Sequence, residues 1–209
     1  MKKIIMVLLS LISMSGLTYA LNESEFNPWT IEASFGMATY PNMMNHDGQT
    51  AIGRLSLGHM FLTKPYWQAG IEAGIQSGNT MRLILPKESI DALGGVPIEA
   101  KMKPLLDVMI GLKSEPLTRF PIVIWLKGGV AYRQLQLDHE SVNDLNEFSP
   151  EIQVGFGCRI NEQATFNLGY QTIGGKQTNL TIQPLTETGI IRYIPTQQAV
   201  LIGFSFNFL

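Results

Sequence analysis

Histidine and cysteine side chains carry much of the nucleophilic and metal chemistry of proteins, and this sequence has few of either. It contains three histidines, His46, His59 and His139, and one cysteine, Cys158. Zinc sites need several such ligands at short, regular spacings, which these scattered residues do not have. A single cysteine cannot form a disulfide within the chain, and we interpret Cys158 as a small apolar filler. The sequence therefore predicts neither a metal site nor a cofactor.

One short run does combine the residue types of a catalytic triad. His139-Glu140-Ser141 holds a base, an acid and a hydroxyl, which together can turn a serine into a nucleophile. Adjacent residues in a polar loop rarely converge on one reacting atom, so we interpret this run as part of a surface loop. The sequence indicates no catalytic residues, and we expect a protein that is not an enzyme.

Charged residues fall instead on one face of segments in which polar and apolar residues alternate. A period of two places side chains on opposite faces of a β-strand. We expect six of these charges to form a network inside the sheet; they are Glu32, Arg54, Glu72, Asp107, Lys127 and Arg159. By register, Glu72, Asp107 and Lys127 should meet near mid-height, with Arg54 higher and Arg159 lower. Charges removed from water need partners, so such a network can pack a closed interior, or it can form an ion path; we favour packing.

Eight alternating segments make up most of the chain and predict eight β-strands. Their approximate ranges are 29–40, 51–62, 66–77, 99–113, 121–136, 151–160, 164–173 and 199–209. Pro104 cannot donate to a ladder hydrogen bond, so we expect a bulge or a late start in the fourth segment. Trp125 falls on the polar face of the fifth segment, where it fits poorly.

The last segment shows most clearly which face meets which medium. Its even-numbered residues are all apolar; they are Val200, Ile202, Phe204, Phe206 and Phe208. A soluble barrel of the lipocalin type would show the same alternation with its apolar face inside. Over all eight segments, however, the apolar face carries almost no charge, with His59 the main exception. A Lys or Arg facing lipid at the midplane costs about 2–4 kcal/mol, so we expect lipid outside and the charges inside.

The connections between the segments alternate in length. Residues 63–65, 114–120 and 161–163 form short connections, whereas 41–50, 78–98, 137–150 and 174–195 form long ones. Short periplasmic turns and long extracellular loops are typical of bacterial outer-membrane barrels. We therefore expect an all-β fold, an eight-stranded antiparallel up-and-down transmembrane β-barrel. Within the long connections we expect a helical turn at 87–93, and at 174–195 a hairpin that continues the last two strands above the membrane. Tyr40 should lie among the aromatic residues of the outer membrane interface.

Residues 1–20 predict a signal peptide rather than part of the fold. Lys2 and Lys3 form a charged start, and the apolar run 4–17 is shorter than the roughly 20 residues of a membrane helix. Thr18-Tyr19-Ala20 suits a signal peptidase, so residues 21–209 should form one exported barrel domain. The net charge of −2 gives no reason to expect nucleic acid as a partner.

On this architecture and on the tail Val200–Phe208, the chain resembles the small outer-membrane β-barrel family, which includes the OmpA-type transmembrane domain and its OmpX-like relatives. The tail is similar to the family's C-terminal assembly signal, which the barrel-insertion machinery reads, although Leu209 follows the final aromatic residue here. The resemblance implies a monomer of the bacterial outer membrane, in contact with lipid and lipopolysaccharide. It also implies a structural or surface-interaction, adhesin-like role.

Two other functions stay open at this point. One is a narrow ion or small-solute channel, although eight strands enclose only enough space for side chains to fill. The other is a lipid A-modifying outer-membrane enzyme, for which His139-Glu140-Ser141 offers the only suitable residue types. The sequence also does not decide whether the loop at 174–195 binds an extracellular protein partner or only shields the barrel mouth.

Overall fold

The computed structural model describes residues 28–41, 50–82, 91, 99–116, 121–138, 142–178, 180–183 and 188–208. The described residues contain eight long strands: β1 (Trp29–Thr39), β2 (Thr50–Lys64), β3 (Trp67–Gln76), β6 (Leu105–Ser114), β7 (Ile122–Leu137), β8 (Leu145–Arg159), β9 (Ala164–Ile173) and β12 (Gln197–Phe208). They also contain four short strands: β4 (Asn79–Arg82), β5 (Glu99–Met102), β10 (Leu180–Gln183) and β11 (Thr188–Ile191). The predicted signal peptide, the predicted turn at 87–93 apart from residue 91, and His46 and His139-Glu140-Ser141 lie outside the described residues.

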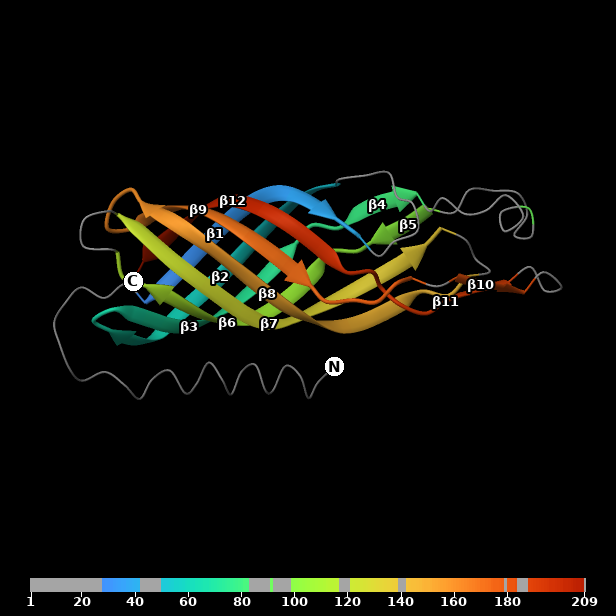
Figure 1. Ribbon diagram of the computed structural model, residues 1–209, viewed down its shortest axis with the longest axis horizontal. Helices are drawn as coiled ribbons and strands as arrows, with labels where there is room; N and C mark the ends of the chain where they lie inside the picture. The colour runs from blue at the N-terminus through green and yellow to red at the C-terminus, as the bar shows by residue number, and fades with distance from the viewer. Residues whose placement is uncertain are drawn as a thin grey trace.

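The eight long strands close into one antiparallel barrel. Each pairs with its neighbours in chain order, β1 pairs with β12, and the additional β7–β8 pairing completes the ring. Following directly opposite residues once around the ring from Trp29 leads back to β1 at Thr39, so one circuit climbs the whole of that strand. The strands are therefore tilted against the barrel axis, as closure requires, and Figure 1 shows them running obliquely to the long axis. This confirms the predicted eight-stranded up-and-down barrel.

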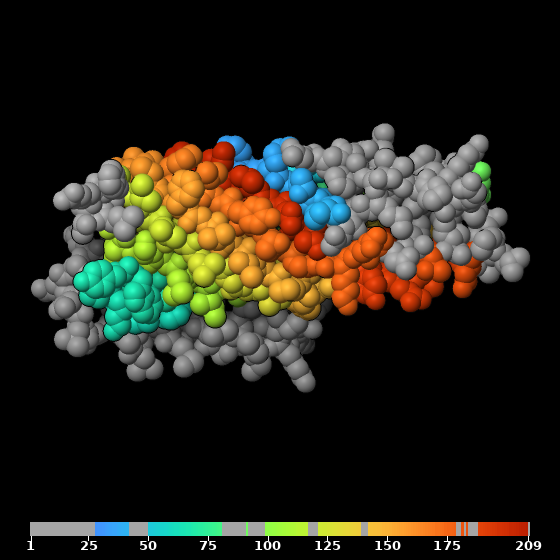
Figure 2. Space-filling view, viewed as in Figure 1, coloured from blue at the N-terminus to red at the C-terminus, as the bar shows by residue number. Residues whose placement is uncertain are grey.

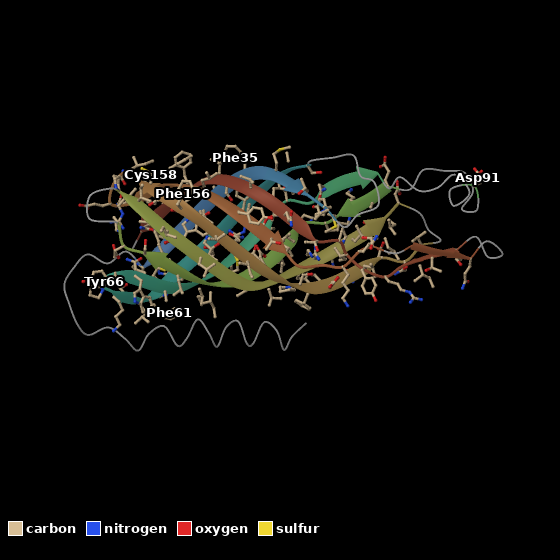
Figure 3. All side chains as sticks on the ribbon, in the orientation of Figure 1. Phe35, Phe61, Tyr66, Asp91, Phe156 and Cys158 are labelled. Atoms are coloured by element: carbon tan, nitrogen blue, oxygen red, sulfur yellow. The ribbon has the colours of Figure 1, made fainter. Side chains whose placement is uncertain are left out.

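The apolar face of the strands lies on the outside of the barrel. Phe35, Ile110 and Phe156 are 63 %, 63 % and 53 % exposed, and Figure 3 labels Phe35 and Phe156 on the outer surface. The intervening residues on the polar face are buried, among them Arg54 and Asp107. An apolar exterior around a polar interior is the arrangement expected for a barrel surrounded by lipid. Among the described residues, no helix is long and apolar enough to cross a membrane.

The two ends of the barrel differ in the length of their connections. At one end, two residues join β2 to β3, and residues 160–163 join β8 to β9. At the other end, β4 and β5 continue β3 and β6 as a hairpin, and β10 and β11 continue β9 and β12 as a second hairpin. Figure 1 shows these hairpins projecting beyond the barrel along its long axis, and Figure 2 shows the β10–β11 hairpin as the orange-red projection. The hairpin predicted at 174–195 is thus present, and the break expected at Pro104 separates β5 from β6. We refer to the part formed by β4, β5, β10, β11 and the adjoining ends of β7 and β8 as the extension.

Two sequence expectations need correction. Residues 137–150 are not one long loop, because β7 continues to Leu137 and β8 already begins at Leu145. Tyr40 is 1 % exposed and lies inside the barrel mouth rather than at the lipid interface. The placement of Trp125 on the polar face is confirmed, because Trp125 lies on the inner face and is 7 % exposed.

The polarity of the two faces inverts along β7. In its first half, Ile124, Leu126 and Val130 point outward and are about half exposed, while Lys127 is buried inside. Beyond Tyr132 the outward residues, Gln134 and Gln136, are polar, and after the buried Arg133 the inward residues, Leu135 and Leu137, are apolar. The inward Leu135 is 1 % exposed. Tyr132 packs against Phe148 of β8 with ring centroids 5.0 Å apart, and this aromatic pair marks the change. The inversion places the outer edge of the lipid-facing band at Tyr132 and Phe148.

Candidate functional site

Arg54 occupies the centre of a charge network in the lumen, the interior of the barrel. Its guanidinium donates from Nε and Nη2 to the two carboxylate oxygens of Asp107, at 3.1 Å and 2.6 Å. Its Nη1 lies 2.8 Å from Glu72 Oε1. The side chains of Arg54 and Asp107 are 1 % and 0 % exposed, so both charges depend on each other rather than on water.

Lys127 extends the same network toward the short-turn end. Its Nζ lies 2.7 Å from Glu72 Oε2 and 3.0 Å from Glu32 Oε2. Glu72 thereby bridges Arg54 and Lys127, and the five residues form one chain across the lumen with three carboxylates and two cations. The structure thus brings together five of the six charges that the sequence singled out.

Arg159 is the sixth, and it does not belong to this network. Its Nη2 lies 3.8 Å from Glu115 Oε2, and the two side chains are 31 % and 29 % exposed. The pair sits at the short-turn end, because Arg159 is the last residue of β8 and Glu115 follows the last residue of β6. A long, solvated pair of this kind contributes little to stability.

Glycines on the inner face make room for the large side chains. A Cβ atom built on Gly74 would lie 2.5 Å from Arg54 Nη2 and 2.7 Å from Asp107 Oδ1. A Cβ atom on Gly155 or Gly169 would collide with the six-membered ring of Trp125. Gly155 lies opposite Trp125 in the β7–β8 ladder and opposite Gly169 in the β8–β9 ladder, so two facing glycines form the slot for the indole. The interior position of Trp125 therefore depends on residues from two other strands.

A small cavity lies beside the network on its short-turn side. Its volume is about 40 Å³, which at roughly 10–15 Å³ each holds about three waters. The residues that line it include Glu32, Lys113, Trp125 and Asn167. Lys127 Nζ lies 5.0 Å above the centre of the Trp125 ring, so an indole face adds to the cation's surroundings. This space is large enough for a few waters but does not amount to an open pore among the described residues.

A layer of amides lies beyond the network toward the extension, and sequence reasoning missed it. Glu151 Oε1 accepts hydrogen bonds from Gln153 Nε2 and Gln171 Nε2, both at 2.7 Å. Gln197 Nε2 donates to Gln171 Oε1 at 3.4 Å, and Tyr40 Oη donates to Gln197 Oε1 at 3.1 Å. Burial raises the pKa of Tyr40, beyond the end of β1, to about 12. The sequence did place Gln153 and Gln171 on the polar faces of their strands, and this pattern could have predicted the amide layer.

An apolar cluster closes the barrel above this layer. It is formed by buried residues of β1, β2, β5, β7, β11, β12 and adjoining segments: Ala38, Tyr40, Ile52, Ala100, Met102, Leu135, Leu137, Val142, Ile191, Ile194, Ala199 and Leu201. We call this set the apolar plug. Leu105, Ala131 and Ile173 form a second buried cluster. Within the described residues the lumen is therefore closed by paired charges and by packed hydrocarbon.

Several solved structures similar to this chain are outer-membrane proteins. Outer membrane protein OprG from Pseudomonas aeruginosa aligns with a TM-score of 0.59 and 13 % identity, covering 87 % of this chain and 96 % of that one. The chain has the fold of the small outer-membrane β-barrels. Neisserial surface protein A is similar with a TM-score of 0.47, 10 % identity and coverage of 86 % and 96 %. Ail, the attachment invasion locus protein of Yersinia pestis, was solved in complex with the heparin analogue sucrose octasulfate. It aligns with a TM-score of 0.48 and 10 % identity, covering 86 % of this chain and 97 % of that one.

These likenesses concern the fold alone, because the sequences have diverged so far. No family model matches the chain, and no curated protein matches its sequence. The role of this outer-membrane barrel must therefore be argued from its own residues.

The predicted assembly signal forms the lipid-facing side of β12. Val200, Phe204 and Phe206 are 51 %, 54 % and 44 % exposed, and Ile202 and Phe208 share their face. Phe204 packs against Phe166 of β9 with ring centroids 5.3 Å apart. β12 pairs with both β1 and β9, so this strand joins the two ends of the chain in the closed barrel.

The described residues show no constellation for metal or nucleophilic chemistry. His59 packs edge-on against Trp29, with ring centroids 4.6 Å apart, at the short-turn end of the outer face. Cys158 is free and exposed on the outer face, where Figure 3 labels it. No group of metal-ligating residues occurs in the part of the chain that the structure describes.

Proposed function

We propose that this protein is a non-enzymatic, monomeric outer-membrane barrel whose role is structural or surface-interacting, carried by its extension. The observation behind this proposal is the doubly closed lumen, with the charge network below and the apolar plug above. Because the interior is filled, the surface left for interaction is the outer end, where the two hairpins project (Figure 1). Lipid and lipopolysaccharide surround the apolar band, and the barrel-insertion machinery places it there.

The plug and the network argue against the runner-up, a narrow ion channel. An ion crossing the lumen would have to displace Arg54 from Asp107 and then pass the apolar plug around Leu135. We expect the purified protein to be silent in planar lipid bilayers, and Lys127→Ala to stay silent because the plug remains. Steady single-channel conductance that changes in Lys127→Ala would favour the channel instead.

A direct test of the surface role targets outward side chains of the second hairpin. Ile190 and Tyr193 are 44 % and 39 % exposed, whereas Ile191 between them is buried in the plug. Ile190→Ser with Tyr193→Ser should reduce binding of the protein to surfaces that the intact protein binds, without unfolding the barrel. The matched control is Phe61→Ser, which alters an exposed aromatic side chain at the opposite end, 54 % exposed. If cells or matrices bound both variants as well as the parent, the surface role of the hairpin would be lost.

The enzymatic alternative has its own readout. We expect lipid A extracted from cells that overproduce the protein to have an unchanged mass spectrum. A change in acyl-chain number that disappears in His139→Ala or Ser141→Ala would establish the enzyme and remove this proposal.

A further inference from the structure

Glu151 is a buried carboxyl group that no cation neutralises by contact. Its residue is 1 % exposed, and both hydrogen bonds to its Oε1 come from neutral amides, those of Gln153 and Gln171. Its Oε2 is buried and has no hydrogen-bond partner among the described residues. Glu151 lies opposite Ile173 in the β8–β9 ladder, so the completely buried second apolar cluster begins beside it.

The charged groups around Glu151 are already engaged elsewhere. Arg54 makes its contacts with Asp107 and Glu72. Arg133, also fully buried, donates from Nε and Nη2 to Ser149 Oγ, from Nη1 to Pro195 O and from Nη2 to Gly174 O, all within 3.1 Å. The negative charge of Asp107 opposes a second one on Glu151, and the charge of Arg54, which is bound to Asp107 and Glu72, only partly offsets it.

What disfavours an ionised Glu151 is the lack of a contacting cation, not the charge count of the lumen. The network of Glu32, Arg54, Glu72, Asp107 and Lys127 holds one more carboxylate than cations, and Lys113 and Arg133 add two cations to the lumen, but within the described residues neither forms an ion pair with Glu151. An ionised Glu151 would add another negative charge in a medium that water does not reach. A buried charge without a partner is so costly that the group takes up a proton instead.

We propose that Glu151 is a proton-binding site of the folded barrel and is a neutral carboxylic acid at neutral pH. The proton resides on Oε2, the oxygen without a partner, while Oε1 keeps the two amide hydrogen bonds. The carboxyl group of Glu151 is linked to the apolar plug by hydrogen bonds through Gln171, Gln197 and Tyr40. When Glu151 loses its proton at high pH, an uncompensated negative charge therefore lies at the base of the plug. The closure of the barrel's outer end is thereby sensitive to alkaline pH.

Infrared spectroscopy of the refolded protein in D2O tests this assignment. The C=O stretch of a protonated carboxyl is separate from the carboxylate bands, and we expect it at pH 7 in the parent and not in Glu151→Gln. Glu32→Gln is the matched control, because Glu32 is an ion-paired carboxylate of the same lumen and its removal should leave the band unchanged. A parent without the band at pH 7, or a Glu151→Gln variant that keeps it, overturns the proposal.

Unfolding as a function of pH gives a second, independent readout. In the unfolded chain a glutamate loses its proton at about pH 4.3, whereas Glu151 keeps its proton in the folded barrel. The parent therefore loses stability as the pH rises above this value, until Glu151 ionises in the folded state as well. Glu151→Gln lacks this dependence. The urea midpoint of the variant minus that of the parent should therefore increase with pH, and a difference that is constant from pH 4 to pH 9 contradicts the proposal.

Discussion

The strand β7 runs without a break from the membrane-spanning part of the barrel into the extension, but its polar and apolar faces exchange sides between the two. In the lower part Leu126 points outward and Lys127 inward, whereas in the extension Gln136 points outward and Leu135 inward. The alternation of side chains is not interrupted between the two. What changes is the medium on the outside, from hydrocarbon to water.

The comparison teaches that the period of a strand and the polarity of its faces carry different information. A period of two specifies a strand with two faces, and the identity of the apolar face specifies the surrounding medium. The lower part holds its interior together with specific ion pairs, while the extension uses an ordinary apolar core. The two parts should therefore respond differently to the same kind of substitution.

Removal of the central cation should have the largest effect. Arg54→Met leaves Asp107 without its partner and Glu72 with only Lys127, and breaking a buried pair costs about 3–5 kcal/mol. Urea unfolding in detergent, followed by the mobility difference between folded and unfolded protein on gels, measures the loss. Adding Asp107→Asn to Arg54→Met should recover part of the lost stability, because the double variant no longer buries the negative charge of Asp107 without a partner. No recovery would mean that packing, not charge, holds this layer.

Truncation of a core side chain separates the two parts. Leu135→Ala in the apolar plug should cost about 2–5 kcal/mol, because it leaves a cavity in packed hydrocarbon. Leu126→Ala on the same strand should cost clearly less, because lipid chains fill the space that the side chain vacates. The urea midpoints of the two variants measure the two losses of stability. Equal losses would contradict the assignment of lipid to the outer face of the membrane-spanning part.

A charge on the outer face tests the boundary itself. Leu126→Lys should cost about 2–4 kcal/mol because the ammonium group would face hydrocarbon. Gln136→Lys, also outward on β7 but beyond Tyr132, should change the unfolding free energy by no more than about 0.5 kcal/mol. Lysines introduced one at a time between these positions would locate the edge of the lipid band, and a uniform cost along β7 would refute the inversion.

The smallest effect expected concerns the slot of the lumen tryptophan. Gly169→Ala places a methyl group against the six-membered ring of Trp125, and overpacking of this kind costs about 1–3 kcal/mol. Trp125→Phe in the same chain should relieve most of the loss, because the smaller ring leaves the slot. Persistent destabilisation in the double variant would show that Gly169 is needed for its backbone rather than for the space it leaves.

Much of the fold was predictable because alternation is a local property. Strand number, the outward direction of Phe35 and Phe204, and the late start after Pro104 all follow from the spacing of residues within a few positions. The placement of Arg159 was not predictable in the same way. It depends on the end of β6, where Glu115 offers a nearer partner than the network does.

Tyr40 was misplaced for a related reason. An aromatic residue just after a strand suits a membrane interface, but Gln197 from the far end of the sequence accepts its hydroxyl hydrogen bond inside the barrel mouth. The sequence pattern likewise placed the start of the sixth strand at Glu151, whereas β8 begins at Leu145 and the polarity of its faces inverts only near Phe148.

By itself, the sequence determined the alternating strands, the apolar exterior and the set of charges that must face inward, because these depend only on which residues are neighbours along the chain. Only the tertiary structure decided which charges pair, where Trp125 finds room and what closes the outer end. Those outcomes depend on the tilt that brings residues from different strands to one height. That tilt is a property of the closed ring, which no single strand contains.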